Sequence, residues 1–225
     1  MLTALWNPFP SHLFPLRPLS RNCRPVLRVG PQSMEKIISE IQHLDPRAWF
    51  LKEKTFTKDG LPDKEWSTLA LRSEHGKPQP FLRPLTADSA KLYRDTELLE
   101  ACPELQKFVH SLSPRVYLVR LLKLTPGARV KFHSDEVAFR DTKLAARFHL
   151  PLTTNPGCIM SMGIPLNAPV PGSHIWNARE IARFHLSLGT LWYTNVNALH
   201  SVCNEGTTDR IHLVIDMAPP VELRA

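Results

Sequence analysis

Residues 116–135 read VYLVRLLKLTPGARVKFHSD, and they give the clearest indication of the fold class. Residues 116–122 form a run of aliphatic and aromatic residues that predicts a strand, and Pro126 with Gly127 predicts a turn after it. A second short strand is expected over 130–135. Further short strands are predicted at 146–152, 158–162, 183–187, 189–194, 199–204 and 210–217. Many short strands separated by turn residues indicate an antiparallel sandwich or a small barrel.

The region before residue 116 mixes helices and strands. Apolar residues recur at helical spacing in MEKIISEIQHL, which begins at Met34. Short strands are expected at 49–51 and 67–71, and a second helix over 95–112 with Asp95 as its cap and a break at Pro103. We therefore expect a mainly β (α+β) protein with three parts: a leader at 1–33, a helical and strand region at 34–115 that packs on the core, and a β core at 116–225.

The first 33 residues differ in composition from the rest of the chain. They contain six prolines, four arginines and no acidic residue, and they show no hydrophobic period. This composition indicates a disordered leader or a misassigned start, and a cytoplasmic protein. The alternative is an organelle-targeting peptide, although the prolines disfavour the amphipathic helix that such a peptide needs.

Composition excludes several classes of protein. The net charge is +7, but without the four leader arginines only 24 basic residues face 21 acidic ones. No basic stripe with interleaved aromatic residues is present, so no nucleic-acid partner is expected. No run of 18 apolar residues predicts a membrane span. Four scattered cysteines without a CxxC pair indicate a reducing compartment and no zinc–thiolate site. The oligomeric state stays open.

Three residues form a pattern that suits a metal ion. Side chains two apart on a strand point to the same face, so His133 and Asp135 can share one ion, and His200 would reach it from a distant strand. Two imidazoles and one carboxylate are the facial-triad ligand set of non-haem Fe(II) oxygenases, which leaves metal positions open. Each part has a simpler interpretation, because an HxD pair arises by chance and a strand histidine is often a hydrogen-bonded polar residue. Their order and spacing together favour the metal site.

A fixed cation follows the second histidine. A turn near Gly206 is expected to return the chain antiparallel, so that His200 lies opposite His212 and Arg210 lies about 7 Å nearer the turn on the same face. Arg210 can then bind the far carboxylate of a short diacid that chelates the iron, although it also fits a surface ion pair. Arg147 and His149, again two apart, either line the same cavity or are a buried structural cation and a core histidine.

Four blocks of the sequence resemble the aspartyl/asparaginyl β-hydroxylase-like oxygenases, a family that includes bacterial proline hydroxylases. The blocks are LTPGARVKFHSD (124–135), RFHLPLTTNPGC (147–158), GTLWYTNVNALHSVCN (189–204) and DRIHLVIDM (209–217). The resemblance implies a double-stranded β-helix (jelly-roll, cupin-like) core that works with Fe(II), 2-oxoglutarate and O₂. The implied roles are iron ligands for His133, Asp135 and His200, the distal-carboxylate partner for Arg210, and co-substrate contacts for Arg147 and His149.

The resemblance also implies a reaction. It is hydroxylation of an amino acid, an amino-acid-like metabolite or a protein side chain, coupled to decarboxylation of 2-oxoglutarate to succinate and CO₂. The complete triad favours hydroxylation over halogenation. Two alternatives stay open: a non-catalytic metal- and 2-oxoglutarate-binding sensor on the same fold, and a cupin-like metalloenzyme without a co-substrate, which Arg210 disfavours.

The sequence does not fix the substrate. We expect the pocket to be built from residues 35–115 and loops of the β core, with the segment 163–182 as a lid or a covered sheet edge. Candidate partners for a substrate carboxylate are Arg72, Arg83, Arg120, Lys131 and Arg140. Candidate aromatic walls are Trp66, Tyr93 and Trp176.

Overall fold

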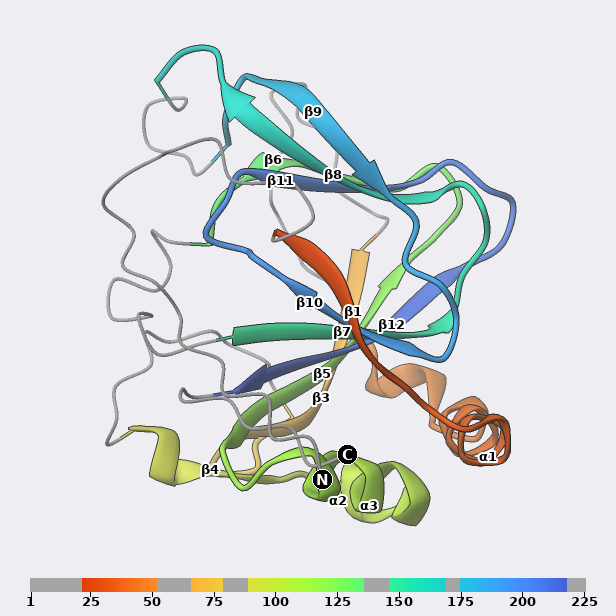
Figure 1. Ribbon diagram of the computed structural model, residues 1–225. Helices are drawn as coiled ribbons and strands as arrows, with labels where there is room; N and C mark the ends of the chain where they lie inside the picture. Colours follow the sequence, from red (N-terminus) through yellow and green to blue (C-terminus); the bar gives the residue numbers. More distant parts are fainter. Residues whose placement is uncertain (1–21, 52–65, 79–88, 136–145, 169–174, 218–225) are drawn as a thin grey trace.

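The computed structural model of the chain describes residues 22–51, 66–78, 89–135, 146–168 and 175–217 (Figure 1). Its strands form two sheets. The eight-stranded major sheet has the order β1-β10-β7-β12-β5-β3-β2, with β4 paired to β3, and the four-stranded minor sheet has the order β6-β11-β8-β9. None of the helices among the described residues is long and apolar enough to cross a membrane.

The major-sheet strands are β1 (Cys23–Arg28), β2 (Phe50–Leu51), β3 (Trp66–Glu74), β4 (Tyr93–Asp95), β5 (Val116–Leu124), β7 (Ala146–Thr153), β10 (Thr190–Thr194) and β12 (Arg210–Met217). The minor-sheet strands are β6 (Arg129–His133), β8 (Cys158–Pro165), β9 (Ala178–Phe184) and β11 (His200–Asn204). The helices are α1 (Pro31–Gln42), α2 (Glu97–Glu100) and α3 (Pro103–Leu112), with short 3₁₀ turns η2 (Pro46–Ala48) and η3 (Ser89–Leu92).

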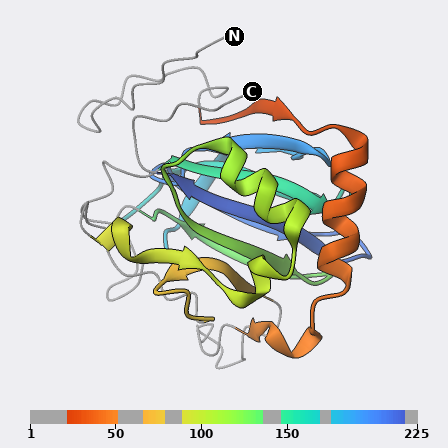
Figure 2. The ribbon, with the colours of Figure 1, turned by 90° about the horizontal axis from the view of Figure 1, so that it is seen from below.

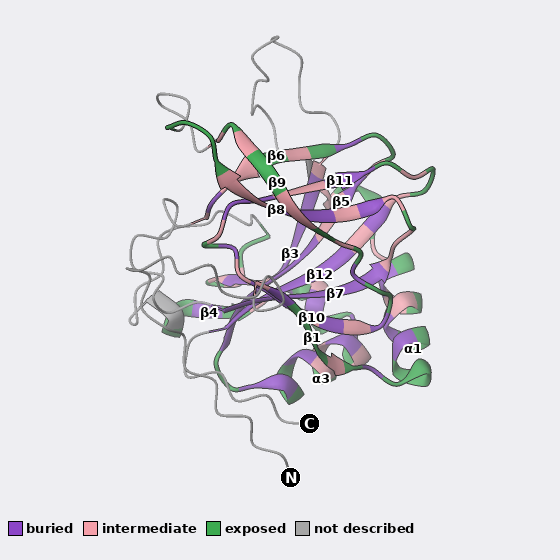
Figure 3. Ribbon diagram, turned by 45° about the horizontal axis from the view of Figure 1, so that its top comes forward, coloured by how far each residue is buried: buried purple, intermediate pink, exposed green. Residues whose placement is uncertain are grey.

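From β5 onward the chain passes back and forth between the two sheets. β5, β7, β10 and β12 belong to the major sheet, whereas β6, β8, β9 and β11 belong to the minor sheet, and the pairings are antiparallel. This winding gives a double-stranded β-helix, and the predicted jelly-roll fold is confirmed. Figure 3 shows that β7 and β12 are buried along most of their length, whereas β6 and β9 are largely intermediate or exposed.

The helices cover the outer face of the major sheet (Figure 2). Buried Met34, Ile37 and Ile41 of α1 recur at helical spacing, so this helix presents an apolar stripe, as the sequence predicted. They join one core cluster with alternate residues of β12, Leu213 and Ile215, while the intervening residues of β12 face the space between the sheets. The major sheet therefore has one apolar face for the helices and one face for the site.

The predicted helix over 95–112 is divided in two, because Pro103 occupies the first turn of α3 and α2 ends at Glu100. The predicted cap at Asp95 is wrong. Thr96 caps α2 through its hydroxyl, and Asp95 pairs with Arg72 on β3, at 2.5 Å between Nη1 and Oδ1. The capping group of α3 comes from α1, since the Glu40 carboxylate accepts hydrogen bonds from two backbone N–H groups at the start of α3, each at 2.9 Å.

The leader predicted at residues 1–33 is too long. Residues 22–33 belong to the fold, because β1 pairs antiparallel with β10 and α1 begins at Pro31. Composition missed β1 because it is an edge strand in which only Cys23 is buried, so no alternation marks it. Its proline, Pro25, sits beside a register irregularity, which suits a residue without a backbone donor. Residues 1–21 lie outside the described part of the chain.

Two expectations about the second half are also wrong. The segment 163–182 is not one long loop, because β8 extends to Pro165 and β9 begins at Ala178, which is five residues before the predicted strand. β11 and β12 do not form a hairpin, because β11 pairs with β6 and β8 whereas β12 lies between β5 and β7. The turn after β11 therefore crosses between the sheets, and His200 does not lie opposite His212 on a paired strand.

Candidate metal centre

The pairing of β6 with β11 brings the two predicted histidine ligands together. His133 and His200 are direct cross-strand partners, and their ring centroids lie 4.2 Å apart. Asp135 follows β6, and its backbone N–H donates to the Val196 carbonyl at 3.0 Å, which ties it to the segment before β11. One ligand atom from each of His133, Asp135 and His200 lies within 4.8 Å of the others. The structure thus assembles the three residues that the sequence singled out.

The hydrogen bonds of the two imidazoles leave the same nitrogen available on each. His133 Nδ1 lies 2.8 Å from the carbonyl oxygen of Lys131, and His200 Nδ1 lies 2.9 Å from that of Ala198. A carbonyl oxygen only accepts, so Nδ1 carries the proton and Nε2 keeps its lone pair. Metal-binding histidines are commonly oriented in this way. The donor set therefore fits a divalent transition metal held by two Nε2 atoms and one carboxylate.

Electrostatics keeps these ligands in the forms that bind metal. Burial, with His133 nearby, lowers the pKa of His200 to about 4, so its imidazole is neutral at neutral pH. Burial alone would raise the pKa of Asp135, but Arg147 and the two histidines outweigh it and lower the pKa to about 2. Metal ligands must be deprotonated, and both groups are deprotonated at neutral pH.

Arg147 of β7 joins Asp135 to a second carboxylate. Its Nη1 donates to Asp135 Oδ2, and its Nε and Nη2 donate to the two oxygens of Asp216 at 2.6 and 3.0 Å. Arg120 of β5 also donates to Asp216 Oδ2, at 3.3 Å. Burial would lower the pKa of Arg147, but the two aspartates raise it, so the guanidinium stays charged. Asp216 and this role of Arg120 were not predicted from the sequence. Asp216 nevertheless lies an even number of residues from Arg210 and His212, so all three belong to the same face of the strand.

Arg210 lies at the start of β12 and is 2% exposed. Its Nη2 lies 2.8 Å from His212 Nδ1, and none of the described carboxylates forms a salt bridge with it. Burial lowers the pKa of Arg210 to about 10, which still leaves it charged at neutral pH. The alternative that Arg210 forms a surface ion pair is therefore wrong. A buried guanidinium without a carboxylate is costly, so this position suits an anionic ligand.

Two more histidines adjoin Arg210. His149 of β7 and His212 of β12 have ring centroids 5.8 Å apart, and both are buried. Within the described part of the chain, His149 Nδ1 and His212 Nε2 have no hydrogen-bond partner. Burial, with Arg210 nearby, holds the pKa of each well below 6.5, so both are neutral. These unpaired nitrogens supply further polar contacts for a ligand between the sheets.

Other predicted substrate residues already have partners. Arg72 is bound to Asp95, and Arg120 is bound to Asp216. Tyr93 packs edge-on against Tyr117. Arg83 and Arg140 lie outside the described residues.

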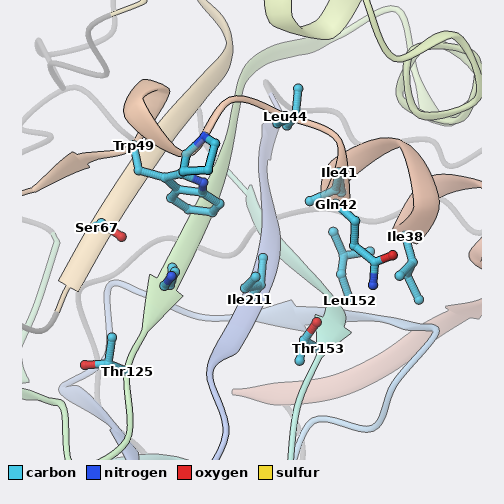
Figure 4. Close-up of a pocket in the computed structure, with 12 residues that line it drawn as sticks. Ile38, Ile41, Gln42, Leu44, Trp49, Ser67, Thr125, Leu152, Thr153 and Ile211 are labelled. Carbon is cyan, nitrogen blue, oxygen red and sulfur yellow. The ribbon is translucent and has the colours of Figure 1, made fainter.

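A cavity among the described residues lies away from this cluster. It has a volume of about 500 Å³ and lies on the outer, helix-covered side of the major sheet, between α1 and the ends of β5, β7 and β12 (Figure 4). Its lining includes Ile38, Trp49, Lys123, Leu152 and Ile211. Its lining contains none of the predicted site residues, and the three-residue ligand cluster lies elsewhere.

Fold and site together define a jelly-roll protein with a two-histidine, one-carboxylate centre and a buried arginine beside it. The family model of the aspartyl/asparaginyl β-hydroxylases matches residues 31–220. The chain therefore belongs to the aspartyl/asparaginyl β-hydroxylase family.

Individual relatives agree with this assignment. The chain is 29% identical over 123 residues to an L-proline cis-4-hydroxylase of Rhizobium meliloti (strain 1021), a match that covers 54% of this chain and 37% of that protein. It is similar to a 2OG-Fe(II) oxygenase family oxidoreductase from Burkholderia pseudomallei, with a TM-score of 0.54, 10% identity, and coverage of 91% and 87% of the two chains. It is also similar to a non-heme α-ketoglutarate-dependent carbocyclase from nogalamycin biosynthesis, with a TM-score of 0.53, 13% identity, and coverage of 88% and 81%. At these identities the solved structures support the fold.

Proposed function

We propose that the protein is an Fe(II)- and 2-oxoglutarate-dependent oxygenase that hydroxylates an amino acid, an amino-acid-like metabolite or a protein side chain. One combination of features carries the proposal. His133, Asp135 and His200 form a preorganised ligand set, and Arg210 is buried and charged but lacks a carboxylate partner among the described residues. A metal site by itself would suit many cupin-like proteins. The additional anion-binding position favours a co-substrate with a carboxylate.

The ligand residues would hold Fe(II) through His133 Nε2, His200 Nε2 and the Asp135 carboxylate. When bound, iron and 2-oxoglutarate supply the activation of O₂: the 2-oxo acid, O₂ and the substrate C–H give succinate, CO₂ and the substrate C–OH. The protein's residues orient the reactants and exclude water from the space between the sheets.

Arg210 would bind the distal carboxylate of 2-oxoglutarate, because a guanidinium offers two parallel donors and stays charged. His149 would lie along the same ligand, since its unpaired Nδ1 and low pKa make it a neutral polar neighbour. Arg147 would flank the co-substrate next to the metal ligand Asp135. The substrate class rests on the relation to L-proline cis-4-hydroxylase, whose match is limited to 37% of that protein.

The test is an O₂-dependent turnover assay after anaerobic reconstitution with Fe(II). Succinate formation would be measured for the wild type, Asp135→Ala and Arg210→Ala, with a panel of free amino acids and short peptides. Arg47→Ala is the matched control, because Arg47 is exposed and forms its ion pair with Asp45, the residue before η2. We expect turnover by the wild type and Arg47→Ala, stimulated by one panel member, and none by the other two variants.

Two results would reject the proposal. A wild type that binds neither iron nor 2-oxoglutarate would remove the facial-triad assignment. A wild type that binds both but forms no succinate with any panel member would favour the alternative, a non-catalytic sensor on the same fold.

A further inference from the structure

Each of the three ligand side chains has a second group that holds its non-ligating atom. The carbonyl of Lys131 holds His133, and the carbonyl of Ala198 holds His200. The corresponding group for Asp135 is a side chain from another sheet, Arg147, which donates to Oδ2. Groups of this kind fix the orientation of a metal ligand.

Asp135 needs such a group more than the histidines do. β6 ends at His133, and the backbone bond from Asp135 to Val196 fixes the main chain but not the direction of the Asp135 carboxylate. With Oδ2 bound to Arg147, the other oxygen, Oδ1, lies 3.5 Å from His133 Nε2. Arg147 thus turns one carboxylate oxygen away from the histidines and leaves the other directed toward them.

Arg147 is in turn fixed by Asp216. The planar guanidinium binds both oxygens of Asp216 along its Nε–Nη2 edge, which determines where Nη1 points. Asp216 is 1% exposed and also accepts from Arg120, and it is not part of the ligand cluster. Its buried charge is therefore used to hold arginines rather than a metal.

We propose that Arg147 is a positioning residue that presents Asp135 to the metal through a single oxygen, and that Asp216 is the anchor that aims Arg147. The inference rests on the metal site of the proposed function and goes beyond the co-substrate role that the family resemblance implied for Arg147. Lysine cannot replace Arg147 in this role, because an ammonium keeps the charge but lacks the fork that spans two carboxylates.

The test measures Co(II) binding by the full chain in the absence of 2-oxoglutarate and O₂, so it does not depend on turnover. Titration calorimetry would give the affinity, and the visible absorption of bound Co(II) would report the ligand geometry. We expect Arg147→Lys to bind Co(II) about 10- to 100-fold more weakly than the wild type, with a changed spectrum. Asp216→Asn is expected to change in the same direction.

The matched control is Arg72→Lys, which makes the same replacement in the partly buried Arg72–Asp95 ion pair of the major sheet. It is expected to lose stability but to keep the wild-type Co(II) affinity and spectrum. Arg147→Lys with wild-type affinity and spectrum would overturn the positioning role and leave the proposed function intact. A wild type that does not bind Co(II) would overturn the metal site and, with it, both proposals.

A second measurement keeps the proposal testable if Arg147→Lys does not fold. Asp135→Gly leaves Arg147 bound to Asp216 and opens the position of the carboxylate. We expect added formate to occupy this position against Arg147 and to restore Co(II) affinity in Asp135→Gly, but not in His133→Ala. Equal effects of formate on the two variants, or no effect on either, would contradict the proposal.

Discussion

Replacing Arg210 with methionine is expected to change stability and ligand binding in opposite directions. Arg210 is 2% exposed, and burial lowers its pKa to about 10. Because the arginine is charged in the unfolded chain at neutral pH, a depressed pKa in the fold means that burying the charge costs about 3 kcal/mol. Methionine fills a similar volume without the charge, so the substitution removes this cost. Loss of the hydrogen bond to His212 offsets about 1 kcal/mol of that stabilisation.

The free energy of unfolding of the ligand-free protein should therefore rise by about 2 kcal/mol, which corresponds to about 4 to 8 °C in Tm for a chain of this size. The same substitution removes a charge-assisted contact to the distal carboxylate, which is worth about 1.5 to 3 kcal/mol, so 2-oxoglutarate should bind about 10- to 100-fold more weakly. Thermal unfolding without ligand, and anaerobic calorimetry with Mn(II) and 2-oxoglutarate, measure the two effects.

The matched control is Arg129→Met, because Arg129 is exposed and paired with Glu205. It should change stability by about 0.5 kcal/mol or less and leave 2-oxoglutarate affinity unaltered. A lower Tm for Arg210→Met together with unchanged 2-oxoglutarate affinity would refute the view that Arg210 is a buried cation that binds an anionic ligand.

Three further predictions concern pH, a helix cap and a turn. Burial lowers the pKa of His200 to about 4, so the unfolded chain binds more protons, and His200 alone should lower the free energy of unfolding by up to about 3 kcal/mol as pH drops from 6.5 to 4. Buried His149 and His212 should lower it further, because their pKa values are also depressed. A constant free energy of unfolding over this range, in urea titrations of the metal-free protein, would contradict the prediction. Glu40→Gln should lower the free energy of unfolding by about 1 kcal/mol in thermal melts, because the charged cap of α3 is lost, and should leave turnover unchanged. Unchanged stability in this variant would argue against the cap. Gly206→Ala would place Cβ against Asn155 Oδ1, so we expect a cost of about 1 to 3 kcal/mol and weaker 2-oxoglutarate binding through the displaced turn before Arg210. Gly30→Ala, with nothing within 4 Å, should leave 2-oxoglutarate binding unaltered and lower stability only through the poorer N-cap of α1.

The sequence predicted most of the β core because its signals are local. The bounds of β12 match the expected strand at 210–217, and the break at Pro103 follows from the backbone chemistry of proline. Edge strands were harder, since β1 buries only Cys23 and carries no alternating pattern. β9 was misplaced for a related reason: none of its residues is fully buried, so the apolar run at its end drew the prediction toward the next segment.

The site was predicted at the level of residues but not of contacts. His133, Asp135 and His200 were found because ligand types at spacing two and in strand context are visible in a sequence. The hairpin geometry for Arg210 failed because sequence alone does not show which sheet a strand joins, and a jelly roll places consecutive strands in different sheets. The link from Asp216 through Arg147 to Asp135 joins residues 69 and 12 positions apart, and only the assembled sheets bring them together.

Fe(II) binding under anaerobic conditions tests the metal centre most directly, by equilibrium dialysis of the wild type and His200→Ala with and without 2-oxoglutarate. We predict one Fe(II) per wild-type chain, tighter binding in the presence of 2-oxoglutarate, and loss of binding in His200→Ala. Equal Fe(II) binding by the wild type and His200→Ala, or no binding by either, would contradict a metal centre formed by His133, Asp135 and His200.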